Sequence, residues 1–416
     1  MFGKAINGIK YWGQLFLLPI YWLSFLFPRS KSVWLFGSTF GRRFADNPRY
    51  FFLYCSQHKD EILIGKKQVR PIWISKDKGI VDFLNSEDYE AYYYHSLKGI
   101  WYCLRGGIYF FDNYSKDISF WLSGRAKKFN MWHGVGNKCI NYDNEHDKVR
   151  HPKNAWEKFK YFPRRLSDEK PSHYILTTSS VISEIFSKAF RIPMEHVVEV
   201  GYPRNDVFYK DCKITNIYTK EEQNTIDVIS RWKSDGKKVL GYMPTFRKSE
   251  DKFKNVMDLD SFNSFLGENN LALVCKLHPK SACKSEFEDI EYSNIYNVTA
   301  NVDINSFLKE IDVLIADYSS VYSDYILMNK PVVAFHYDYE EYMSGTRSSY
   351  FDFDEYMPEE KAFTMEELQV SILKVLDLKD FSEIRSETIH NMFGDIKTNV
   401  SELLCKKIVE LLKKGD

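Results

Sequence analysis

The chain has 416 residues, enough for two domains of ordinary size, and its 57 Lys and Arg residues balance 57 Asp and Glu residues. A formal net charge of zero argues against a general polyanion binder, although a local basic face is compatible with it. The seven cysteines are scattered, odd in number and without a Cys-x-x-Cys pair, which is typical of a reducing compartment without structural disulfides.

The first segment, residues 1–28, is apolar and aromatic. Lys10, Gln14 and Pro19 interrupt it, and its unbroken part, 15–27, is shorter than the ~20 residues that a membrane span needs. No small-residue cleavage site follows, so we do not expect a cleaved signal peptide. Aromatic residues with basic flanks favour a helix in the membrane interface. The alternatives are a hairpin or helix packed on the protein's own core, and a true membrane span.

Strands and helices alternate after this segment. Residues 138–170 are charged and irregular, which favours a mobile lid or an acceptor loop. The turn-rich residues 201–206 are predicted to lead out of the first domain. Strands are predicted over 33–38, 69–75, 89–94, 107–112, 129–132, 173–177 and 197–200, with helices from an Asx cap at Asp46-Asn47-Pro48, over 77–86 and 95–104, and from Ser179 or Ser180.

The second half repeats this alternation. Apolar residues at helical spacing in the Lys-rich tail predict a packed terminal helix over 397–414. Because alternating strands and helices imply parallel sheets covered on both faces, we predict an α/β fold of two Rossmann-like domains facing a cleft, over 29–212 and 213–416. Strands are predicted over 238–243, 271–276, 313–316 and 332–336, and helices near 221–234, 303–310, 320–328 and 365–376.

His133 follows a short aromatic strand and precedes Gly134-Val-Gly. Polar residues at the carboxyl ends of buried strands are where open α/β sheets bind ligands. The glycines allow a substrate to approach closely, and a histidine can remove a proton from an attacking hydroxyl. Lys138 is placed to attract a phosphate. The alternative is that both are ordinary surface residues.

Side chains suited to phosphate recognition follow the strands of the second half. A helix that begins after Ser319 and Ser320 would offer free backbone N–H groups to a diphosphate, although the serines could also be plain helix caps. Guanidinium groups add charge-assisted contacts. The set comprises Thr245, Arg247, Lys276, His278, Asp317, Ser319, Ser320, Asp324 and Arg347.

Several well-known motifs are missing. The sequence has no P-loop, no Gly-x-Gly-x-x-Gly fingerprint and no serine-nucleophile elbow, and no carboxylate cluster suggests a metal site. Cys275, His278 and Cys283 lie close together, but no second ligand pair accompanies them. We therefore predict a metal-free, cofactor-free transfer from a nucleotide diphosphate donor, with His and Arg charges in place of a metal.

Taken together, an ordered set of short strings resembles the CDP-glycerol glycerophosphotransferase family of teichoic acid and capsule synthesis. The resemblance implies a glycosyltransferase-B-like fold, with an acceptor-side domain over 29–212 and a CDP-donor domain over 213–416. It implies transfer of glycerol phosphate or ribitol phosphate to a hydroxyl of a lipid-linked or glycan acceptor. The strings are Ser38 with Asp46–Pro48, Trp132-His133-Gly134, 201–206, 244–247, Leu277-His278-Pro279, 317–320 with Asp324, and 337–339 leading to Arg347.

The resemblance also implies residue roles. His133 would be the general base, with Asp46, Gly134 and Lys138 on the acceptor side. A peripheral position on the cytoplasmic face of the cell membrane, and no nucleic-acid partner, follow from the same resemblance. The CDP-donor would be held by Arg247, His278, Ser319, Ser320, Asp324 and Arg347.

Two departures bear on specificity. Val135-Gly-Asn137 replaces the family's usual Thr-Pro-Leu, and Ser348 follows Arg347 where a glycine is usual. These differences leave the polyol and the acceptor open. Two rival functions remain: a nucleotide-sugar glycosyltransferase of the same fold, and a membrane-docked binding module that retains the donor pocket.

Overall fold

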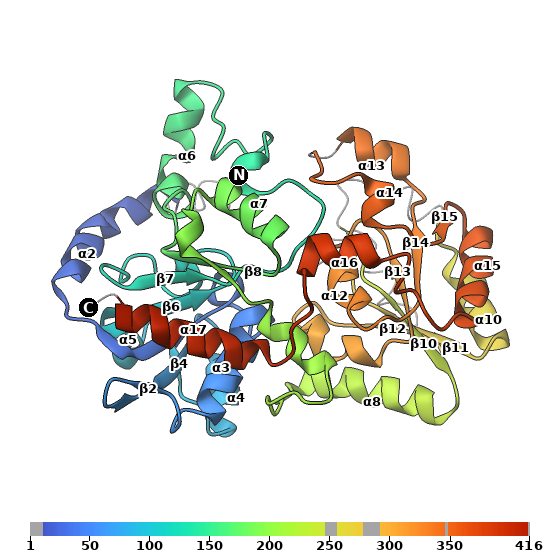
Figure 1. Ribbon diagram of the computed structural model, residues 1–416, viewed down its shortest axis with the longest axis horizontal. Coiled ribbons are helices and arrows are strands. Elements are labelled where there is room, and N and C mark those ends of the chain that lie inside the picture. The colour runs from blue at the N-terminus through green and yellow to red at the C-terminus, as the bar shows by residue number, and fades with distance from the viewer. Residues whose placement is uncertain (1–10, 246–255, 278–291, 346–347, 415–416) are drawn as a thin grey trace. The chain divides into compact units, whose positions relative to one another are not determined.

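The computed structural model describes residues 11–245, 256–277, 292–345 and 348–414. The chain forms two compact units (Figure 1). Unit 1 comprises Met1–His133, Ile140–Ile217 and Lys397–Asp416, and unit 2 comprises Gly134–Cys139 and Tyr218–Ile396. Each unit is built on a parallel sheet, so the predicted α/β class is confirmed.

The sheet of unit 1 has seven strands in the order β5-β4-β1-β6-β7-β8-β9, and its neighbouring strands are parallel. The chain order reverses between β1 and β6, which makes that position the topological switch point where such sheets bind ligands. The strands are β1 (Ser30–Phe36), β4 (Arg70–Ser75), β5 (Ala91–Tyr93), β6 (Gly106–Phe111), β7 (Lys127–Asn130), β8 (Tyr174–Thr177) and β9 (Val197–Glu199).

Several helices of unit 1 begin where a side chain supplies a cap. Asp77, Ser96 and Ser179 accept hydrogen bonds from the first-turn amides of α4, α5 and α7. A small antiparallel pair, β2 (Leu63–Ile64) and β3 (Lys67–Gln68), completes the unit. The helices are α2 (Leu18–Leu23), α3 (Asp46–Gln57), α4 (Lys78–Ser86), α5 (Leu97–Arg105), α6 (Ala155–Asp168), α7 (Ser180–Phe190) and α17 (Val400–Lys414), with short 3-10 turns η1 (Gln14–Leu17), η2 (Ser24–Leu26), η3 (Thr39–Gly41), η4 (Ser115–Asp117), η5 (Asn141–Asp143), η6 (Met194–His196) and η7 (Pro203–Phe208).

Two local predictions in unit 1 are wrong. Residues 138–170 are not irregular throughout, because Asn154 accepts a hydrogen bond from the Glu157 amide and starts the 14-residue helix α6. The dense charges of this helix and its internal Pro163 drew attention away from its helical periodicity. At the start of α3 the cap position is Ala45, without a side-chain bond, rather than an Asx cap.

The terminal helix α17 forms as predicted but does not belong with the C-terminal domain. It contacts α3, η7 and β2 of unit 1 (Figure 1). The buried Asp206 carboxylate accepts hydrogen bonds from the amides of Val400 and Ser401 at 2.7 and 2.8 Å, at the start of this helix. An apolar stripe predicts that a helix packs, but it does not specify the surface that receives it.

The sheet of unit 2 has six strands in the order β12-β11-β10-β13-β14-β15, again parallel, with its switch point between β10 and β13. The helix predicted over 303–310 is instead two 3-10 turns, η8 (Ile304–Ser306) and η9 (Leu308–Glu310). The strands are β10 (Lys238–Tyr242), β11 (Leu271–Cys275), β12 (Ile295–Asn297), β13 (Val313–Ala316), β14 (Val332–Phe335) and β15 (Lys361–Ala362), and the helices are α8 (Lys220–Ser234), α10 (Leu259–Glu268), α12 (Val321–Ile326), α13 (Tyr339–Gly345), α14 (Phe353–Tyr356), α15 (Met365–Leu376) and α16 (Ser386–Phe393).

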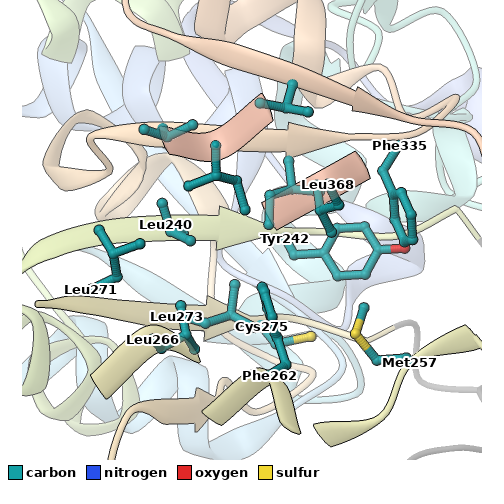
Figure 2. Packing of buried hydrophobic residues seen from close by; sticks show 14 of the residues in the cluster. Leu240, Tyr242, Met257, Phe262, Leu266, Leu271, Leu273, Cys275, Phe335 and Leu368 are labelled. Carbon is teal, nitrogen blue, oxygen red and sulfur yellow. The ribbon is translucent and has the colours of Figure 1, made fainter. Parts of the chain in front are cut away.

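The core of unit 2 shows why its strands carry continuous apolar runs. Leu240 and Tyr242 of β10 and Leu273 of β11 pack with Phe262 of α10 and Leu368 of α15 (Figure 2). The intervening residues of these strands are buried as well. Because both faces of the sheet are covered, its strand ends are held firmly, and the loops that follow them are well placed to present side chains to a ligand.

Candidate functional site

The two sheets carry the same polar arrangement at their switch points. In unit 1 Asp112 follows β6 and accepts hydrogen bonds from the Ser38 hydroxyl and the Thr39 amide, at 3.0 and 2.9 Å, just after β1. In unit 2 Asp317 follows β13 and accepts them from the hydroxyl and amide of Thr245, at 3.0 and 2.7 Å, after β10. A buried carboxylate therefore ties together the two strand ends that border each ligand-binding position.

The His133 side chain is exposed just beyond β7 and has a defined orientation. Its Nδ1 lies 3.1 Å from the Asp112 carbonyl oxygen. A carbonyl only accepts, so Nδ1 carries the hydrogen and Nε2 keeps its lone pair. The Trp132 ring packs against the imidazole at 4.1 Å between centroids. The imidazole is thus held as a tautomer that can accept a proton at Nε2.

The backbone that carries His133 is held by two side chains from distant segments. The Asn47 amide donates to the carbonyls of the two residues before His133, at 3.2 and 2.9 Å. Arg204 is 4 % exposed, and its Nη1 donates to the His133 carbonyl at 2.8 Å and to Asp46 Oδ1 at 2.9 Å. Asp46, predicted on the acceptor side, therefore lies in the network around the histidine. Arg204 and Asn47 belong to the strings that carry the family resemblance but were not predicted as site residues.

A second buried carboxyl group, that of Asp117, lies next to Asp112. Asp117 is fully buried and accepts hydrogen bonds from the amides of Phe40 and Asn113, at 2.9 and 2.8 Å. Burial, and then the nearby Asp112 charge, raise the pKa of Asp117 well above its usual range. Nothing in the local sequence distinguishes Asp117 from an ordinary turn residue.

In unit 2 the predicted serines follow β13 in a tight turn. The Ser319 amide donates to Asp317 Oδ1 at 3.0 Å. Ser320 is exposed and precedes the six-residue α12, but its side chain makes no cap hydrogen bond, so a plain helix cap does not explain it. Asp324 lies within α12 and is only 4 % exposed, which places its carboxylate inside the unit rather than on its surface.

Lys138 and the glycine-rich segment before it lie in unit 2, with the serine turn. The Lys138 ammonium sits 4.6 Å from the centre of the Tyr342 ring, which stacks on Tyr318 at 3.6 Å, next to the serines. A Cβ added to Gly136 would meet Ser320 Cβ at 3.2 Å. The predicted acceptor residues are therefore divided, because Gly134 and Lys138 group with the predicted donor set and Asp46 groups with His133.

Sequence reasoning missed His336 as a site residue, although it directly follows β14 in unit 2. The residue is 1 % exposed. Its ring stacks on the Tyr318 ring, with 5.0 Å between centroids, and meets the Phe353 ring edge to face at 5.1 Å. Burial lowers the pKa of His336 to about 4, although the nearby Asp317 carboxylate opposes that shift. His336 is therefore neutral at pH 7. A histidine directly after a buried apolar strand is the same signal that identified His133.

Three predicted donor residues, Arg247, His278 and Arg347, lie outside the described residues, so their roles stay predictions. Within the parts of the chain that the structure describes, no group of three or more His, Cys, Asp or Glu side chains is arranged to hold a metal ion.

Known proteins resemble this chain over nearly its whole length. The family model for CDP-Glycerol:Poly(glycerophosphate) glycerophosphotransferase matches residues 20–409. A teichoic acid poly(glycerol phosphate) polymerase of Bacillus spizizenii is 28% identical over 93% of each chain. A teichoic acid poly(ribitol-phosphate) polymerase of the same species is 30% identical over 56% of this chain and 37% of its own.

Solved structures share the fold. A structure of the wall teichoic acid polymerase TagF superimposes with a TM-score of 0.71 at 20% identity, covering 100% of this chain and 98% of that one. A putative UDP-N-acetylglucosamine 2-epimerase from Listeria monocytogenes gives a TM-score of 0.54 at 12% identity, over 93% and 98% of the two chains. At these identities the likeness concerns the fold alone.

Proposed function

The chain belongs to the CDP-glycerol:poly(glycerophosphate) glycerophosphotransferase family and is a polyol-phosphate transferase, and we propose that His133 is its general base. The observation that carries this proposal is the His133 tautomer. An exposed imidazole whose Nδ1 is engaged by a backbone carbonyl can accept a proton only at Nε2. The Asn47 and Arg204 hydrogen bonds keep the backbone of this residue in place.

The proposed reaction begins with proton transfer to this base. A hydroxyl of a lipid-linked or glycan acceptor gives its proton to His133 Nε2, and its oxygen bonds to the phosphorus that carries the polyol. The bond from that phosphorus to the bridging oxygen breaks, and CMP leaves with the electron pair. The donor is a CDP-polyol, and no cofactor takes part.

The donor set of this proposal lies in unit 2. The Ser319 and Ser320 side chains stand at the switch point of its sheet, where ligands bind in such folds. Lys138 adds a positive charge beside them. Arg247, His278 and Arg347 would neutralise the diphosphate in place of a metal ion. Glycerol is favoured over ribitol, because the similarity to the glycerol phosphate polymerase covers 93% of this chain and that to the ribitol phosphate polymerase 56%.

The leaving nucleotide tests this function directly. The full chain is incubated with a lipid-linked acceptor and either CDP-glycerol, CDP-ribitol or a UDP-sugar, and the released nucleotides are quantified with and without EDTA. We expect acceptor-dependent release of CMP that EDTA does not change. Release of UDP from a UDP-sugar, without CMP release, would support a sugar transferase instead. Loss of activity in EDTA that Mg²⁺ restores would contradict the metal-free mechanism.

We also propose that unit 1 docks peripherally on the cytoplasmic face of the membrane. In the described part of the chain, no helix has the length and apolar character to cross a bilayer. The segment around α2 uses one face for packing, since the Tyr21 ring stacks on Phe120 at 4.7 Å. Its other face exposes large apolar side chains, namely Phe16, Ile20, Trp22, Leu23 and Leu26.

Helix α6 extends this apolar surface. Trp156, Phe159 and Phe162 are exposed on it, and the Phe159 ring contacts the Trp12 ring of the first segment at 4.7 Å. The Tyr11 hydroxyl donates to the Lys160 carbonyl at 3.0 Å. Exposed basic side chains lie on or near the same helix, and they would attract anionic lipid. These are Lys153, Lys158, Lys160 and Arg164.

A double substitution tests the docking surface without disturbing its packing. Trp22→Ser with Leu26→Ser removes side chains that are 66% and 75% exposed and leaves Tyr21 on Phe120. We expect affinity for phosphatidylglycerol vesicles to fall roughly tenfold or more, because full burial of each side chain contributes about 1.5–3 kcal/mol. Vesicle flotation measures the effect. Val370→Ser with Leu373→Ser on α15 is the control, and equal flotation of all three proteins would place docking elsewhere.

A further inference from the structure

A small cavity in unit 1 lies beside β7, the strand that leads to His133. The volume that the centre of a water molecule can occupy in it is about 20 Å³. Its lining includes polar side chains from segments that are far apart in the sequence. The residues that matter here are Asn113, Ser115, Lys128, Asn130, Ser167 and Lys170.

Lys128 is an unusual residue for the middle of a buried strand. It is only 6% exposed, whereas the neighbouring Lys127 is exposed. Because side chains alternate along a strand, Lys128 and Asn130 share one face, and both line the cavity. Among the residues that the structure describes, no hydrogen bond or ion pair engages the Lys128 ammonium.

The surroundings of Lys128 add positive charge. Burial, and then the charges of Lys170 and Arg29, lower the pKa of Lys128 to about 8, so the group is still mostly protonated at pH 7. A buried ammonium without a counterion is unfavourable. A ligand that brings negative charge to this place would therefore be favoured.

The carboxylates of the cavity lining are already paired with other cations. Asp168 binds Lys116 and Arg164 at 2.6 and 2.8 Å, and Glu169 binds Arg165 at 2.8 Å. Because these two carboxylates are neutralised by other side chains, the positive charges of Lys128 and Lys170 are not balanced within the cavity lining.

We propose that this cavity binds a phosphate group, with Lys128 as its central cation. The Ser115 hydroxyl supplies a donor of the kind that phosphate oxygens need. The side-chain amide of Asn130 supplies another, because only one of its two N–H groups is used by the Asn113 carbonyl, at 3.4 Å. A sphere of this volume, widened by the ~1.4 Å radius of a water molecule, has a radius of roughly 3 Å, which is close to that of a phosphate.

The position of the cavity connects it to both proposed activities of unit 1. Asn130 Oδ1 accepts a hydrogen bond from the Trp132 amide at 2.9 Å, directly before His133. The Lys170 ammonium donates to the hydroxyl of Tyr21, on the proposed membrane-docking segment. The phosphate therefore belongs either to the acceptor or to an anionic lipid headgroup, and the acceptor source rests on the proposed function.

Adjacent lysines provide a matched test. In the full chain, Lys128→Met is compared with Lys127→Met and the unchanged protein, in sodium phosphate and in sodium chloride of equal ionic strength. Phosphate is expected to raise the thermal unfolding midpoint of the unchanged protein and of Lys127→Met more than that of Lys128→Met. Without phosphate, Lys128→Met should unfold at the same or a higher temperature, because it loses an unpaired buried charge. Phosphate bound at the donor site would shift all three proteins equally, so an equal shift overturns the proposal.

Chemical labelling identifies the source of the phosphate. Acetylation of Lys128 near pH 8 is followed by mass spectrometry, in the presence of soluble glycerol phosphate or of vesicles of phosphatidylglycerol or phosphatidylcholine. Protection by glycerol phosphate assigns the site to acceptor phosphates. Protection by phosphatidylglycerol vesicles alone assigns it to a headgroup. Absence of protection under every condition overturns the proposal, and this result is independent of whether CMP is released in the transfer assay.

Discussion

The variant His133→Ala is expected to lower the rate of polyol-phosphate transfer by roughly 10²–10⁴-fold, the usual contribution of a general base. Affinity for the CDP-donor should stay unchanged, because the predicted donor residues belong to unit 2 and His133 belongs to unit 1. Single-turnover rates give the first quantity, and calorimetry with CDP-glycerol gives the second. A change in rate without a change in donor affinity distinguishes loss of the base from loss of the fold.

A surface histidine supplies the control for this result. His146 is exposed in the loop after η5, and His146→Ala should transfer at the normal rate. If His133→Ala kept more than about a tenth of the normal rate, a general base would have to be sought among other residues.

The largest expected effect on stability comes from a buried ion pair in unit 2. Arg385 and Glu359 have side chains that are 0% and 1% exposed, and Arg385 Nε lies 2.7 Å from Glu359 Oε1. The Tyr322 hydroxyl donates to the other carboxylate oxygen at 2.8 Å. Arg385→Met leaves this carboxylate buried without its cation. We expect the free energy of unfolding to fall by about 3–5 kcal/mol, measured by urea denaturation.

Two further variants show whether the unpaired charge is the cause. Adding Glu359→Gln to Arg385→Met should recover most of the loss, because an uncharged amide is less costly to bury. Lys374→Met removes the cation of the exposed pair with Glu360, 2.8 Å away, and should cost no more than about 1 kcal/mol. If the double variant were as unstable as Arg385→Met, lost packing rather than charge would explain the effect.

The sequence was most informative about strands and the polar residues at their carboxyl ends. Apolar runs located the main strands of both sheets, and polar residues just beyond those runs drew attention to His133, Thr245 and Asp317. The parallel arrangement follows from the alternation of strands and helices alone. Strand ends are predictable because burial and backbone hydrogen bonding leave a clear periodic pattern in the sequence.

The missed features depend on contacts between distant residues. Arg204 reaches the His133 carbonyl across 71 positions, and no local pattern indicates such a contact. Lys128 resembles any other lysine until its burial is known. The raised pKa of Asp117 comes first from its burial and then from the charge of Asp112, and the sequence does not reveal that burial.

The place of α17 has a consequence for how the protein is made. The N-terminus of a chain leaves the ribosome first, and domains generally fold as they emerge. Unit 1, however, includes Lys397–Asp416, so its last helix appears only after all of unit 2 has been synthesised. Until then the Asp206 carboxylate lacks the amides of Val400 and Ser401, and the surface of α3 that α17 contacts remains uncovered. The first unit to begin folding is thus the last to be completed, and a nascent chain stalled before residue 397 would expose an unfinished apolar surface to chaperones and proteases.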